Sequence, residues 1–415
     1  MSHDPRGDDE LLIFGKRQAP LSETDAFIEE MFRDLFRWSH PVLGPVLRET
    51  EGLYRYVFEL LAMEVPQRRK AVRSLPYRNL EVAELLLEES AKAAPKRPKQ
   101  SEERAVLAEW ITAQSWPEAR EKATRVRAEA CMCQGDARRL LCDWQGAELG
   151  FGAAFSALQK LPTGLEHVFF HVKLAKLRED QGRLREAADL LWQAMNRYCQ
   201  YSQSAPPNDI VVKLAYVYLK LNDPGRAMTL FTHLCLQVEG PFAGWHQAEI
   251  ALGQAMCLAA FGLDEPARLL LDESKPLRRC IFDRDKVLRL EWLECKIAVH
   301  LGDLDQAIPR LEAIRRWLLR DQDLVDVCLS SIDLAFAHAT RVQAAERLPA
   351  LLEDLAKLPG ASEYPWALGS LWWFREMVEQ GRDPADAARQ AAEIVHRRET
   401  SLLRLADSYP GKDRC

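Results

Sequence analysis

The chain lacks the short motifs that mark familiar enzymes. None of its ten cysteines forms a CxxC pair, which excludes the commonest zinc-binding and thioredoxin-like signatures. The sequence also contains no GxxxxGKS/T, GxGxxG or GxSxG, so a phosphate-cradling loop and a nucleophile elbow are both missing. Its many carboxylates are typical of solvated helix faces. We therefore predict a protein that is not an enzyme, with no catalytic residue, no metal site and no cofactor.

A membrane-spanning segment is also missing from the sequence. No apolar run approaches the roughly 20 residues that cross a bilayer. The polar, acidic start "MSHDPRGDDE" resembles neither a signal peptide nor a transit peptide. The formal net charge of -6 gives no reason to expect binding to nucleic acid or to an anionic membrane. We expect a cytoplasmic protein with neither of these as its partner.

Two clusters of potential metal ligands are interpreted as packed helix residues. In "CMCQGDARRLLCDW", Cys131 and Cys133 stand two apart, so on a helix their side chains point about 200° apart and cannot chelate one ion. His167 and His171 share a helical face in "EHVFFH", but Val168 stands where the zinc-protease pattern needs Glu. A metal-dependent enzyme is kept as the residual alternative.

A repeat of forty residues organises the middle of the chain. Four segments align: "AKLREDQGRLREAADLLWQA", "AYVYLKLNDPGRAMTLFTHL", "AMCLAAFGLDEPARLLLDES" and "CKIAVHLGDLDQAIPRLEAI". Each has a small residue, a Gly or Asn turn seven positions later, and an alanine five positions after that. The anchoring alanines are Ala187, Ala227, Ala267 and Ala307.

Six copies keep the phase of this repeat. The small residues are Gly135, Ala175, Ala215, Ala255, Cys295 and Ala335. The large residues of the second helix are Phe151, Leu191, Phe231, Leu271, Leu311 and Leu351. A small residue lets a second helix cross closely above the first, and the turn residue takes the left-handed conformation that ends the first helix. One helix pair cannot bury its apolar face alone, so the copies must stack.

This pattern resembles the tetratricopeptide repeat, in a bacterial long-repeat form. The motifs "QGRLREA", "FGLDEPA" and "LGDLDQA" carry the resemblance, although the usual unit of that family is nearer 34 residues. It implies an all-α solenoid of antiparallel helix pairs, wound as a right-handed superhelix. We expect a disordered segment over 1–20, a helical cap with a degenerate repeat over 21–119, six repeats over 120–358, and a C-terminal cap and tail over 359–415.

The resemblance also implies a binding surface on the concave side of the superhelix. Its side chains stand on the first helix of each copy, three before, one after, and four or five after the small residue, and residues two before that position flank it. The positions that we expect to bind a partner are Lys173, Lys176, Lys213, Tyr216, Lys220, Trp292, Lys296, His300 and Phe336. The alternative is a generic amphipathic helix face packed on its neighbour.

The nature of these side chains favours a protein or peptide partner. Cations beside aromatics suit an extended segment with acidic groups or a free carboxylate. We therefore predict an adaptor that captures such a segment. The alternative is a peptide-sensing transcription regulator, although residues 20–90 show no convincing helix-turn-helix. A basic stretch over 66–99 is interpreted as a solvated helix face, with contact to nucleic acid or to the acidic N-terminal segment as alternatives.

Overall fold

The computed structural model describes residues 52–74, 76–95, 97–114, 119–202, 207–236, 243–276, 284–321, 324–341, 344–357 and 365–398. Helices make up these residues and no β-strand occurs among them, so the predicted all-α solenoid of antiparallel helix pairs is confirmed. The disorder predicted over 1–20 lies outside the described residues.

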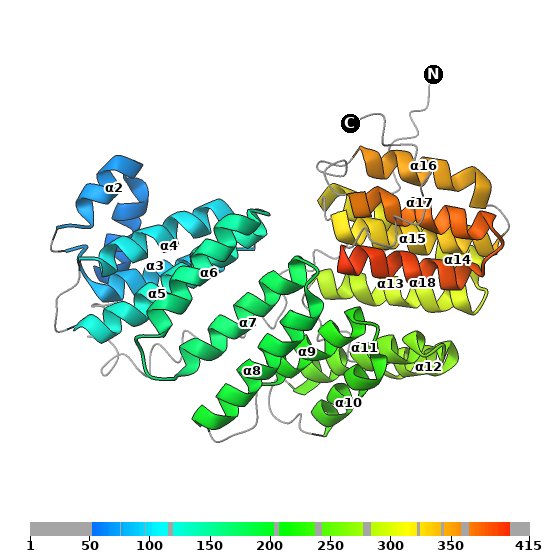
Figure 1. Cartoon of the computed structure of the whole chain (residues 1–415), viewed down its shortest axis with the longest axis horizontal. Helices are drawn as coiled ribbons and strands as arrows, with labels where there is room; N and C mark the ends of the chain where they lie inside the picture. The colour runs from blue at the N-terminus through cyan, green and yellow to red at the C-terminus, as the bar shows by residue number, and fades with distance from the viewer. Residues whose placement is uncertain are drawn as a thin grey trace. The chain divides into compact units, whose positions relative to one another are not determined.

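The chain forms two compact units (Figure 1). The N-terminal unit contains the described parts of 14–177 and 196–205, and the C-terminal unit contains those of 178–195 and 206–415. The helices of the N-terminal unit are a helical segment over 52–62, α2 (Val65–Ala71), α3 (Leu80–Ala93), α4 (Pro98–Thr112), α5 (Arg120–Leu140) and α6 (Trp144–Leu158). Two helices contribute to both units: α7 (Leu165–Asp180) and α8 (Leu184–Ser202).

Five helix pairs follow in the C-terminal unit. They are α9 (Asn208–Lys220) with α10 (Pro224–Cys235), α11 (Ala243–Ala260) with α12 (Asp264–Glu273), α13 (Arg284–His300) with α14 (Leu304–Asp321), α15 (Leu324–Thr340) with α16 (Ala344–Ala356), and α17 (Pro365–Glu379) with α18 (Pro384–Arg397). Each copy of the forty-residue repeat is therefore one helix pair. The degenerate pair predicted before the first copy is found as α3 and α4.

In the first five copies, the turn position of the repeat ends the first helix in the same way. Its backbone is left-handed, with φ of 59° at Cys142, 75° at Gly182, 58° at Asn222, 74° at Gly262 and 86° at Gly302. At Gly182, the amide donates to the Glu179 carbonyl, and the next amide, of Arg183, donates to the Arg178 carbonyl. This pair of bonds satisfies two carbonyls at the helix end. The same two hydrogen bonds recur at each of the other four turns. In these copies they fix where the second helix of the pair begins.

The small residues, the anchoring alanines and the large residues of the repeat are all buried where the helices cross. The anchoring alanines have at most 1% of their surface exposed, and the large residues at most 6%. In the first copy the crossing is close, since a methyl group on Gly135 would stand 3.0 Å from the Phe151 ring. Any larger residue at Gly135 would push α6 away from α5, which explains why a glycine stands there.

The cysteines of α5 pack into different parts of the core. Cys131 belongs to the cluster built around Phe151, whereas Cys133 belongs to the cluster of α3 and α4. Burial raises the pKa of Cys131 to about 12 and that of Cys133 to about 11, so both thiols stay protonated. The prediction that they are packed helix residues is confirmed. No group of three or more His, Cys, Asp or Glu side chains arranged to hold a metal ion occurs in the described ranges.

Candidate protein-binding face

Each first helix carries one face whose positions are equivalent from copy to copy. We call this the first-helix face: the positions of α5, α7, α9, α11, α13 and α15 that stand three before, two before, one after, and four or five after the small residue. The second helices pack behind it, against the small residues. All nine residues that the sequence predicted to bind a partner belong to this face, and their role in binding stays a prediction.

Lys173 pairs with a carboxylate on the preceding first helix. Its Nζ lies 3.0 Å from Oδ2 of Asp136 on α5, and Asp136 also accepts from Arg139 at 2.8 Å. Burial works against both charges, but the opposite partner prevails: the pKa of Lys173 is raised and that of Asp136 is lowered. This lysine therefore joins two helices of the N-terminal unit.

Lys296 makes the equivalent pair in the C-terminal unit. Its Nζ lies 3.2 Å from Oδ1 of Asp333 on α15, and Nε1 of Trp292 donates to Oδ2 of the same carboxylate at 2.8 Å. Trp292 is only 9% exposed and belongs to the core cluster of α13–α18. The predicted aromatic anchor is thus mostly buried against its own chain.

Lys220, His300 and Phe336 also contact neighbouring helices. Lys220 of α9 pairs with Glu179 at the end of α7. His300 lies 3.3 Å from a carboxylate oxygen of Asp264, and its ring meets that of Phe336 edge to face, with centroids 5.2 Å apart.

Tyr216 is half-buried, and its ring meets that of Phe231 edge to face, with centroids 5.5 Å apart. Burial, followed by the charge of Glu249, raises the pKa of Tyr216. Its phenol therefore stays protonated at neutral pH.

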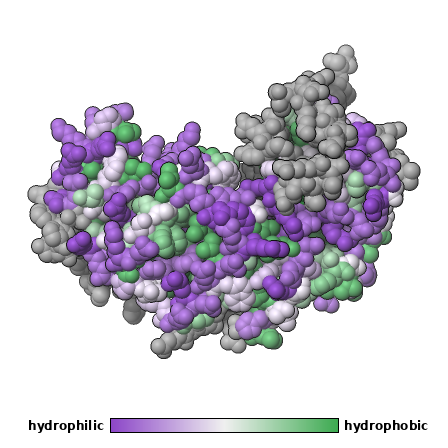
Figure 2. All heavy atoms as spheres, in the orientation of Figure 1, coloured by the Kyte–Doolittle hydropathy of each residue, from purple (hydrophilic) through white to green (hydrophobic). Residues whose placement is uncertain are grey.

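Exposed side chains are found on the face of α7, α9 and α11. Lys176, Lys213 and Ala260 are exposed, while Met256 and Leu219 are half-buried. Figure 2 shows that the described surface is mostly hydrophilic in that view, with hydrophobic patches between the charged side chains. A lysine beside half-buried apolar groups can bind a segment that offers both an acidic and an apolar side chain.

Sequence reasoning missed the carboxylates of this face. Asp136 with Lys173, and Lys296 with Asp333, stand at the same two repeat positions: one after the small residue, and two before the next small residue. Their shared spacing of 37 residues, with opposite charges, is a signal that the sequence contains. It is visible only when the positions of successive copies are compared in pairs.

The basic stretch near α2 is held locally. The Arg68 guanidinium donates to the carbonyls of Leu61 and Met63, at the end of the preceding helical segment, and pairs with Glu103 at 3.2 Å. The guanidinium of Arg69 lies over the Trp110 ring, 5.1 Å from its centroid. These two arginines serve the packing of their own unit.

The fold is similar to that of a solved helical-repeat protein. That structure, titled "Crystal Structure of Rap Protein Complexed with Competence and Sporulation Factor", has a TM-score of 0.55 and 14% sequence identity, over 79% of this chain and 89% of that chain. The comparison with family models and with curated proteins finds no match. No helix among the described residues is long and apolar enough to cross a membrane.

Proposed function

We propose that this chain is a non-enzymatic adaptor that binds a peptide or a segment of a partner protein on its first-helix face. The observation that carries the proposal is the surface of α9 and α11, where exposed Lys213 stands on the same face as half-buried Tyr216 and Met256. Stacked helix pairs commonly bind partners through such a face. The structural neighbour is a complex with a bound factor, which supports the same mode of action.

The partner segment is expected to combine an apolar side chain with an acidic group or a free carboxylate. Several lysines of the face already have a carboxylate from their own chain, as the Lys173, Lys220 and Lys296 pairs demonstrate. An acidic ligand must therefore compete with these internal pairs or meet Lys213. Because Lys213 is exposed, its attraction is screened by salt and contributes more to the rate of association than to affinity.

We also propose that the array is a long form of the tetratricopeptide repeat. The left-handed turns of the first five copies, the buried small residues and the buried alanines support this proposal. A peptide-sensing regulator that acts through a partner is the second candidate. It is favoured by the bound factor of the structural neighbour, since a factor that changes the state of such an array can control what else the array binds.

A selection from displayed peptides tests the proposed function. The full chain is challenged with a library of random twelve-residue peptides, and the affinity of each selected peptide is measured by calorimetry. We expect Lys213→Glu to weaken the selected acidic peptides about ten-fold, whereas the same charge change at exposed Arg185, on the second helix α8, leaves them unaffected. Failure to select any peptide, or equal losses in both variants, would overturn the proposal.

A further inference from the structure

The last helix departs from the repeat. In the other pairs of the C-terminal unit, a second helix packs against its own first helix and the next one, whereas α18 packs against α17 and, in addition, the earlier first helix α15 (Figure 1). The sequence also departs from the repeat here: Arg375 stands forty residues after Ala335, where the copies have a small residue. Its side chain pairs with Glu379 and lies over the Trp372 ring, both on α17 itself.

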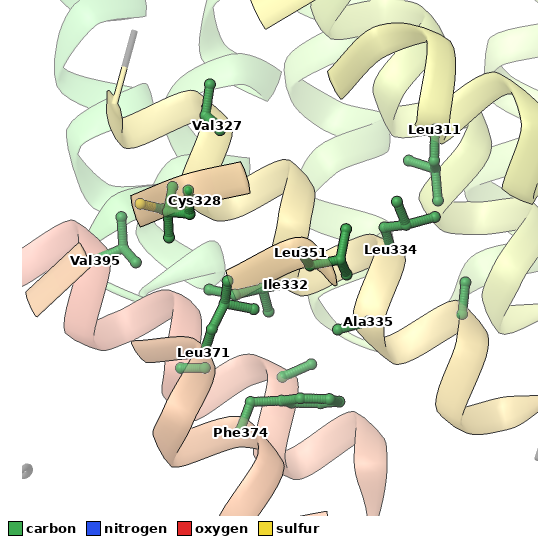
Figure 3. Close-up of a cluster of buried hydrophobic side chains, with 14 of the residues drawn as sticks. Leu311, Val327, Cys328, Ile332, Leu334, Ala335, Leu351, Leu371, Phe374 and Val395 are labelled. Carbon is green, nitrogen blue, oxygen red and sulfur yellow. The ribbon is translucent and has the colours of Figure 1, made fainter. Parts of the chain in front are cut away.

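The apolar side of α18 lies against the first-helix face. Ile394 is fully buried and Val395 is 1% exposed, in one cluster with Ile332, which stands three before the small residue Ala335 of α15. Figure 3 shows Val395 of α18 beside Cys328 of α15. The rest of the buried side of α18 consists of three alanines: Ala387, Ala388 and Ala391.

The end of α18 reaches the other first helices of the same unit. His396 lies close enough to Lys220 of α9, to Lys296 and Arg289 of α13, and to Glu179 of α7 for their charges to act on its pKa. Directly after it, the carbonyl oxygen of Arg397 would lie 2.6 Å from a Cβ on Gly182, the turn residue between α7 and α8. Because Gly182 has no side chain, the helix end can lie that close to the turn.

We infer that α18 is a built-in ligand of the first-helix face, and that an external amphipathic helix with small apolar residues competes with it for the same surface. This inference rests on the proposed function and adds the class of partner: a helix whose apolar stripe resembles Ala387, Ala391 and Ile394. A helix seated in a groove is recognised through anchors three and four residues apart, which is the spacing of this stripe.

The way in which α18 is held makes it exchangeable. Alanines bury little apolar surface, so Ile394 and Val395 provide most of the hydrophobic contact. Directly after these two residues, His396 must stay uncharged among three cations and one carboxylate. A tethered helix of this kind acts at a high effective concentration, and the apparent Kd of an external competitor is the intrinsic Kd divided by the fraction of time that the tethered helix is released.

The test uses a synthetic, end-blocked peptide of residues 383–398 as the probe. Fluorescence anisotropy measures its binding to the full wild-type chain and to Ile394→Asp, in which the chain's own α18 is unseated. We expect the variant to bind the peptide at least about ten-fold more tightly than the wild type. The matched control is Gln390→Asp, which places the same carboxylate on the exposed side of α18 and should behave like the wild type.

A second measurement guards against misfolding of the variant. Hydrogen exchange on the wild-type chain is followed with and without excess peptide, and a scrambled peptide serves as control. We expect the native peptide alone to accelerate exchange of the chain's own α18 amides, while the amides of α15 stay protected. Unchanged protection of α18 at saturating peptide, or no binding to a folded Ile394→Asp chain, overturns the inference. Selected library peptides that still bind through Lys213 would then leave the proposed function standing.

Discussion

The first-helix face differs between α9–α11 and α13–α15, although both regions are built from the same repeat. Three positions before the small residue, the side chains are buried in both regions: Val212 and Leu252 in the first, Trp292 and Ile332 in the second. The second region packs against a further helix, α18, along α15, whereas the first is approached only by the end of α18, where His396 lies near Lys220 of α9. Packing between copies therefore buries part of this face everywhere, and the last helix adds to that burial at one end.

A second comparison concerns the order in which the acid and the base of each ion pair occur along the chain. Asp136 and Lys173 occupy the two repeat positions with the acid first, whereas Lys296 and Asp333 occupy them with the base first. The solenoid therefore needs a complementary pair at this contact and is indifferent to its direction. A lysine at either position forms an ion pair with the neighbouring copy, and a binding partner must compete with that ion pair.

The largest effect on stability is expected for Trp292→Ala, in the α13–α15 region. Removal of a buried indole leaves a cavity and typically costs about 3–5 kcal/mol of unfolding free energy. It also removes the donor to Asp333. Urea unfolding measures this loss, and Trp292→Phe, which keeps most of the bulk, should lose less. Wild-type stability in Trp292→Ala would show that this residue is not part of the core.

Seating of α18 should weaken in acid. Burial, followed by the charges of Lys220 and Lys296, lowers the pKa of His396 to about 3, with Arg289 adding to the effect and Glu179 opposing it. In a released helix, the imidazole titrates at about 6.5. The seated form binds fewer protons, so its advantage is complete above about pH 6.5 and is lost as the pH falls toward 3.

Hydrogen exchange of the α18 amides at pH 7.5 and at pH 5 measures this effect, after correction for the intrinsic rate. We expect protection of α18 to fall at pH 5 relative to that of α10. In His396→Gln, which is neutral at both values, the difference between the two helices should disappear. Equal protection of α18 at both pH values in the wild type would contradict a buried neutral imidazole.

The smallest effect on the free energy of unfolding is expected for the two ion pairs, in which acid and base occur in opposite order. Double-mutant cycles on Asp136 with Lys173, and on Lys296 with Asp333, should each give a coupling of about 1 kcal/mol or less, because both lysines are partly exposed. Thermal or urea unfolding supplies the four stabilities of each cycle. A coupling of opposite sign in the two regions would mean that polarity matters and that the two contacts are not equivalent.

The repeat architecture could be predicted because it depends on local rules. A residue that allows a left-handed turn, a small residue and an alanine each recur at a fixed position. Their common spacing of forty residues makes the pattern recognisable. Even Cys142, an unusual turn residue, stands forty residues before Gly182 and has a φ of 59°.

The binding face could be predicted only as a set of positions. Whether Trp292 is surface or core depends on Asp333, which stands 41 residues later, and no local pattern connects the two. The position of α18 depends on a contact with α15, which lies two helices before α17, the first helix of its own pair. A missing small residue at Arg375 hints that the last pair is irregular, but it does not say where the helix goes instead.

Site-specific photocrosslinking in cells that produce this protein tests the central claim most directly. A crosslinking amino acid replaces Lys213 on the first helix α9 in one chain, and Thr232 on the second helix α10 of the same copy in another; both positions are exposed. The account predicts a discrete protein or peptide adduct from position 213 and none from position 232. Adducts from position 232 alone, or none from either, would contradict a partner-binding first-helix face.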